Sequence, residues 1–248
     1  MKKIVSLSFA ICTLLVITNC KKKPSNTVET GSASIVLNHF WEDSVFQLGT
    51  IYRNAVTSDT FNFETFKYYL SNVQLKNTAG NWIRLNDSYF LVDLSDTTSE
   101  NLVLKNVPKG NYTACSILFG IDSLHNISGA QTGVLSPTNG MFWSWNTGYI
   151  MLKMEGLSPN SSSNDFAFHV AGFEGPFSVL HRKEIDFDGA VLNVSTNHPK
   201  IVVDVAVNEL WNNIPSLSIS SFVQSVGLKS RDLAYSFTNS WYFKQLEN

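Results

Sequence analysis

Short apolar stretches, many of them alternating with polar residues, recur along the chain between turn-forming residues. Alternation with a period of two is typical of strands that bury one face, and Gly, Asn and Ser mark the turns. The pattern predicts an all-β fold: an antiparallel β-sandwich of Greek-key or immunoglobulin-like type with long loops and little helix. The expected strands lie within residues 33–41, 61–77, 81–86, 88–94, 101–122, 148–156, 165–173, 190–195 and 200–211.

Two segments have a spacing that also suits a helix. Residues 221–237, SFVQSVGLKSRDLAYSF, are the better candidate, and residues 64–72, ETFKYYLSN, are the weaker one because they lie inside an expected strand. Helix is therefore expected mainly near the end of the chain.

Two connections are long. One covers residues 172–190, and the other runs from Gly120 to Trp145 and ends in dense aromatics. Long loops in compact domains are often functional, and burial of aromatic rings stabilises an ordered loop. We expect the loop from Gly120 to Trp145 to pack on the sheet.

The N-terminus reads MKKIVSLSFAICTLLVITNC. A basic start followed by an apolar run shorter than the ~20 residues of a membrane span is typical of a secretory signal. The run closes on Cys20 as the lipobox of bacterial lipoproteins does, although Asn19 replaces its usual small residue. We expect a signal peptide at residues 1–19, a lipidated Cys20 with a flexible linker through residue 32, and one β domain at residues 33–248. The alternative is an ordinary cleaved signal with an incidental cysteine.

Such an anchor would place the protein in the bacterial cell envelope, on the periplasmic or surface side of the outer membrane. The formal charge is −2, and it becomes −4 when the signal removes Lys2 and Lys3. An acidic chain without a basic stripe gives no indication of nucleic-acid binding. Cys115, the cysteine left in the domain, lies in an apolar strand pattern and is expected to be buried. No pattern typical of a catalytic set is present, so we expect no enzyme activity.

The stretch GIDSLHNISGAQTGVLSPTNGMFWSWNTGYIMLKMEG, followed by FAFHVAGFEGP, resembles the MbnP-like family of periplasmic copper-binding proteins. LNHFW near the start and LVLKNVPKGNYTACSILFGID resemble the same family, so the resemblance covers nearly all of the expected domain. It implies a β-sandwich that binds copper outside the cytoplasm. It also implies that one tryptophan of a Trp-x-Trp pair, here Trp143 and Trp145, is oxidised to kynurenine by a di-haem partner of the MauG-like class.

Histidine is the residue type to consider for copper, because imidazole suits both of its redox states. No two histidines have a paired spacing, so a site must combine separate segments. His39 falls where the family's first-strand histidine lies. His169 is opposite in phase to its apolar neighbours, and His125 lies in the aromatic-ended loop. We expect His39 and His169 to meet in one pocket, with His125 within reach, whereas His181 and His198 are interpreted as surface and turn residues.

The two tryptophans share one face of a strand because they are two residues apart. The resemblance favours a role in lining the copper pocket. An alternative from another class is a carbohydrate- or peptide-binding module in which Trp41, Trp143 and Trp145 form a stacking platform. Plain aromatic packing, with a purely structural role for the protein, is the third possibility.

Overall fold

The structure is a computed structural model that describes residues 28–248 except 144–147, 196 and 213–214. The predicted signal segment, Cys20 and Trp145 lie outside the described residues. The first strand begins at Thr30, inside the range expected for the linker. Among the described residues, every helix is too short or too polar to cross a membrane.

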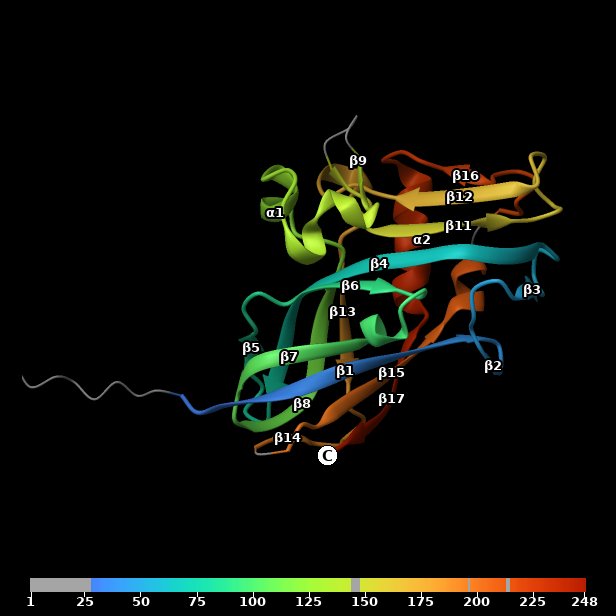
Figure 1. The fold of residues 1–248 in the computed structure, drawn as a ribbon. Helices are drawn as coiled ribbons and strands as arrows, with labels where there is room; N and C mark the ends of the chain where they lie inside the picture. The colour runs from blue at the N-terminus through green and yellow to red at the C-terminus, as the bar shows by residue number, and fades with distance from the viewer. Residues whose placement is uncertain (1–27, 144–147, 196, 213–214) are drawn as a thin grey trace, which may run out of the picture.

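Two large sheets face each other and confirm the predicted all-β, sandwich-like fold (Figure 1). The smaller sheet has the order β17-β15-β1-β2, and β7 also pairs with β1. Its strands are β1 (Thr30–Trp41), β2 (Ser44–Val45), β7 (Asn101–Pro108), β15 (Lys200–Ala206) and β17 (Trp241–Glu247).

The larger sheet has the order β13-β8-β4-β11-β12-β16, while β14 pairs with β8, and β3, β5 and β6 pair with β4. Its strands are β3 (Ile51–Arg53), β4 (Thr60–Asn77), β5 (Trp82–Arg84), β6 (Tyr89–Asp93), β8 (Gly110–Phe119), β11 (Leu152–Leu157), β12 (Asp165–Val170), β13 (His181–Asp186), β14 (Leu192–Val194) and β16 (Phe222–Val223). The 18-residue β4 runs through the middle of this sheet.

Most strand pairs are antiparallel, as predicted, but β1–β15 and β12–β16 are parallel. The parallel pairs join segments far apart in the chain, and the alternation of residues within one strand does not distinguish the direction of its neighbour. A two-stranded hairpin, β9 (Phe142–Trp143) with β10 (Gly148–Tyr149), stands apart from both sheets.

Helices are few in the described part of the chain. The helix predicted near the end is confirmed as α2 (Leu228–Asn239), whereas the weaker candidate at 64–72 is wrong because those residues belong to β4. A short helix, α1 (Ser123–Ile127), lies in the long loop after β8. Single turns of 3-10 helix are η1 (Thr97–Glu100), η2 (Gly133–Leu135), η3 (Pro137–Asn139), η4 (Gly175–Phe177) and η5 (Val207–Trp211).

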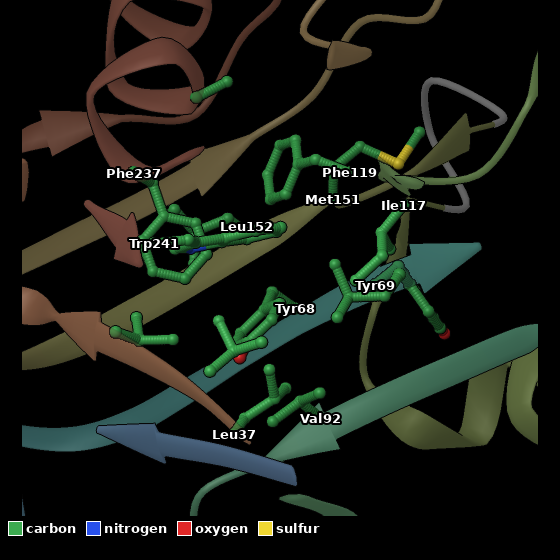
Figure 2. Close-up of a cluster of buried hydrophobic side chains, with 14 of the residues drawn as sticks. Leu37, Tyr68, Tyr69, Val92, Ile117, Phe119, Met151, Leu152, Phe237 and Trp241 are labelled. Carbon is green, nitrogen blue, oxygen red and sulfur yellow. The ribbon is translucent and has the colours of Figure 1, made fainter. Parts of the chain in front are cut away.

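Aromatic side chains fill the space between the sheets and α2. Figure 2 shows Phe237 of α2 and Trp241 close together, above Tyr68 of β4. The Tyr68 and Phe237 ring centroids are 4.9 Å apart, and those of Phe237 and Trp241 are 5.4 Å apart. Edge-to-face contacts at such distances stabilise cores beyond the burial of area alone. Cys115 is buried as predicted, and burial raises the pKa of its thiol to about 12.

Candidate functional site

The two faces of the larger sheet determine which candidate residues meet. Tyr68 of β4 pairs with Leu152 of β11, which pairs with Val170 of β12, and all three are fully buried toward the core. The adjacent row, Lys67–Lys153–His169, has the opposite phase and points to the other side of the sheet. We call the two sides the core face and the outer face.

His39 lies on the core face. Its ring is 5.9 Å from the Tyr68 ring and 6.4 Å from the Phe66 ring. Nδ1 is 2.6 Å from Glu100 Oε1, and Nε2 is 2.8 Å from the Tyr68 hydroxyl. Both ring nitrogens are thus engaged by protein groups, and the side chain is almost fully buried. Burial and the charge of Glu100 raise the pKa of Tyr68, so its hydroxyl stays protonated.

His169 lies on the outer face, as its phase predicted. Its Nε2 is 2.7 Å from Glu155 Oε1, and Lys153 Nζ is 3.4 Å from the other oxygen of that carboxylate. Burial lowers the pKa of His169, although the Glu155 carboxylate opposes the shift. Burial alone would raise the pKa of Glu155, but the hydrogen bond from His169 and the charge of Lys153 outweigh it and lower that pKa. The site therefore favours a neutral imidazole beside a carboxylate.

The expectation that His39 and His169 share a pocket is wrong in this structure. His39 contacts residues on the core face, whereas His169 belongs to the outer row of the same sheet. The strand phase of His169 was interpreted correctly. The pattern within one strand does not show which face of the larger sheet packs against the smaller sheet, and His39 comes from the smaller sheet.

Trp143 lies against His169 on the outer face. The two ring centroids are 6.5 Å apart and the rings are inclined by 46°. Trp143 is 7% exposed and pairs with Gly148 in the β9–β10 hairpin. The same indole lines a cleft of 180 Å³ that extends to Gly172 and Val226. Trp145, the second tryptophan of the pair, lies outside the described residues.

The loop that carries Trp143 packs on the sheet, as predicted for its described part. Tyr69, on the outer face of β4, contacts Tyr149 edge to face with ring centroids 5.8 Å apart. The Tyr69 hydroxyl donates to the Val134 carbonyl at 3.0 Å, and the Tyr149 hydroxyl donates to the Leu135 carbonyl at 2.7 Å. These contacts position the hairpin above the outer row.

His125 lines a different cleft. Its Nδ1 is 2.8 Å from the Tyr89 hydroxyl and 3.1 Å from Asp122 Oδ1. That cleft also contains Arg84 and Arg182, and neither Trp143 nor His169 is among its lining residues. His125 thus does not join the other candidates in this structure.

The remaining candidates have structural partners. Trp41 is 4% exposed and stacks on Tyr52 with ring centroids 4.9 Å apart, so it cannot belong to an exposed stacking platform. His198 lies between two serine hydroxyls, with Nδ1 at 2.7 Å from Ser32 Oγ and Nε2 at 2.7 Å from Ser34 Oγ. His181 packs its ring edge to face on Tyr235.

The donors on the outer face offer a partial fit to copper. His169 supplies an imidazole and Glu155 a carboxylate, and imidazole is a good copper ligand. Within the part of the chain that the structure describes, no three His, Cys, Asp or Glu side chains come together as a metal-binding group. Among the described side chains of these types, His169 and Glu155 are the pair that the outer face brings together beside Trp143.

Comparison with known proteins identifies the family. The family model MbnP matches residues 30–224, which is most of the chain. The chain belongs to the MbnP family. A solved structure with the same fold is MbnP from Methylosinus trichosporium, with a TM-score of 0.52 and 14% sequence identity over 82% of this chain and 84% of that one. No curated protein matches the chain.

Sequence reasoning missed the partners of the MbnP-family histidines. Glu155 and Lys153 alternate with the apolar Leu152 and Met154. This alternation indicates that both polar side chains point to the outer face. Glu100 of η1 and Tyr68 of β4 contact His39 across 61 and 29 residues of chain, and no local pattern predicts such pairs.

Proposed function

We propose that this protein is a copper-binding lipoprotein of the cell envelope, whose copper site lies on the outer face at His169, beside Trp143. The observation that carries the proposal is the indole ring of Trp143 beside a mostly buried imidazole that also contacts a carboxylate. Membership of the MbnP family supports it, because the family is in general related to copper.

The chemistry of these residues suits the role. A neutral imidazole has a lone pair for copper, and the lowered pKa of His169 keeps it neutral. Glu155, 2.7 Å from Nε2, holds the ring in place and fixes which nitrogen carries the proton. A bulky indole beside the imidazole excludes water from a bound ion.

We further propose that Trp143 or Trp145 is the residue that a di-haem partner of the MauG-like class oxidises. Indoles are electron-rich, and the Trp143 ring lies beside the proposed ligand and lines a cleft. Peptide mass spectrometry after co-production with such a partner and peroxide would locate the change.

Replacing His169 with alanine is expected to weaken copper binding by about a hundredfold or more, since it removes the imidazole ligand itself, and loss of a partner that only orients a ligand already costs about ten- to a hundredfold. Titration of the purified protein with Cu(I) against a chromogenic chelator measures the affinity. His198→Ala is the matched control. It also removes an imidazole, but the hydrogen-bond partners of His198 are Ser32 and Ser34 rather than residues of the proposed site. Equal affinities of the wild-type protein and the His169→Ala variant would contradict the proposal.

Replacing Cys20 with serine is expected to move the protein from the membrane fraction to the soluble periplasmic fraction. A lipidated cysteine carries several acyl chains, and two or more give stable attachment where one is marginal. Fractionation of cells followed by immunoblotting measures the distribution. A serine variant that stays with the membrane would show that the lipobox interpretation is wrong.

A further inference from the structure

A second cleft, away from the proposed copper site, is lined by basic side chains. It has a volume of 680 Å³ and its lining includes Arg84 at the end of β5, Arg182 of β13, and His125 of α1. Its size is within the range of small-molecule sites, and polar groups rather than apolar ones converge on it.

A register shift in β4 places Asn72 in the lining of this cleft. The register between β4 and β8 shifts between Ser71 and Gln74, and Asn72 there has a left-handed φ of 52°. Its carbonyl accepts a 3.0 Å hydrogen bond from Arg182 Nη1, and its amide donates to Asp122 Oδ2 at 2.9 Å. Bulges of this kind redirect side chains and are frequent beside functional sites.

The guanidinium groups of Arg84 and Arg182 line the cleft, and neither forms an ion pair with a carboxylate of the described residues. Arg182 Nη1 donates to neutral acceptors, the Asn72 carbonyl and Ser116 Oγ at 3.1 Å. Within the described residues, neither Arg84 nor Arg182 has an ion-pair partner within 4.0 Å. Burial and the like charge of Arg84 lower the pKa of Arg182, which the charge of Glu184 partly opposes. Two guanidinium groups that line one cleft without a carboxylate within ion-pair distance favour the binding of an anion there.

Two carboxylates, those of Asp87 and Asp122, also line the cleft, and Asp122 is held by neighbouring donors. Asp122 accepts from the Tyr89 hydroxyl, from Asn72 and from the His125 backbone, and these bonds lower its pKa against the effect of burial. Burial raises the pKa of Tyr89, and the hydrogen bond to Asp122 and the charges of Asp122 and Asp87 add to that shift. Neither aspartate is among the groups that shift Arg182.

We propose that this cleft binds a small oxyanion, a carboxylate or a phosphate group, between the guanidiniums of Arg84 and Arg182. Guanidinium presents N–H donors in a planar fork that matches both groups, and Arg182 still has donors beyond Nη1. The inference is independent of the copper site, because in the described structure the two clefts share no lining residue.

The test is isothermal titration calorimetry at constant ionic strength with inorganic phosphate in one arm and succinate in the other. We expect at least one of them to bind, and Arg84→Gln to weaken that binding by about tenfold or more, since charge-assisted hydrogen bonds are lost. Arg84 is exposed at a strand end, so its replacement should leave the fold intact. Arg182→Gln should have at least as large an effect, and thermal unfolding checks that this variant is folded.

Arg53→Gln is the matched control, because Arg53 is also an exposed arginine on a strand paired with β4. Binding in the phosphate arm alone or the carboxylate arm alone, with the arginine dependence, supports the proposal and identifies the ligand class. Absence of binding in both arms, or equal binding by the Arg84→Gln and Arg53→Gln variants, overturns it.

Discussion

Replacing His39 with alanine is expected to lower the free energy of unfolding by about 3 kcal/mol, and to leave copper affinity unchanged. The imidazole bridges Glu100 and the buried hydroxyl of Tyr68 at 2.6 and 2.8 Å. Its removal leaves the fully buried Tyr68 hydroxyl without this partner and creates a cavity beside aromatic rings. Chemical denaturation measures the change in stability, and chelator competition measures the affinity.

Two variants sharpen this test. His39→Gln keeps a polar group that can reach Tyr68, and it should recover part of the lost stability. His198→Ala removes an exposed histidine whose partners are two serine hydroxyls, and it should have a much smaller effect. A folded His39→Ala protein that no longer binds copper would instead show that His39 is a ligand.

Replacing Gly156 with alanine is expected to lower the free energy of unfolding by about 3 kcal/mol or more. An added Cβ would lie 2.1 Å from the carbonyl oxygen of Asn62 and 3.0 Å from the Phe166 ring. The register of β11 on β4 shifts next to Gly156, where the two backbones come too close for a side chain. Strand β11 would have to move away from β4, with loss of hydrogen bonds and of packing on both strands.

Gly227→Ala is the control for this variant. Its added Cβ would meet nothing within 4 Å, so any general effect of a glycine-to-alanine change appears there without a clash. Thermal unfolding of both variants, followed by circular dichroism, gives the comparison. A Gly156→Ala protein as stable as the control would mean that the strands separate at little cost.

Alternation within single strands predicted much of this molecule. It gave the sandwich class, the outward direction of His169 and the burial of Cys115, because each depends on local phase alone. It failed where the outcome depends on partners distant in sequence. The parallel pairing of β1 with β15 joins residues about 166 apart, such as Ser34 with Lys200.

The histidines show the same division between local and distant information. The resemblance to a family selected His39 and His169, but it carried no statement of the face on which each lies. The pairing of β4 with β11 and β12 puts them on opposite sides. The expectation that Trp143 lies beside His169 agrees with the structure, because the loop from Gly120 folds back over β12.

Strand β4 makes the two sides of the larger sheet one cooperative unit. Tyr68 holds His39 in the core, its neighbour Lys67 pairs with Asp93 on the outer face, and Tyr69 supports the loop that carries Trp143. A local opening that freed the outer row from β4 would also expose the aromatic core, and would cost nearly as much as unfolding the whole domain. The free energy needed to open the outer face around His169 is therefore close to that of global unfolding. A ligand that binds there binds to a surface that is already ordered in its absence.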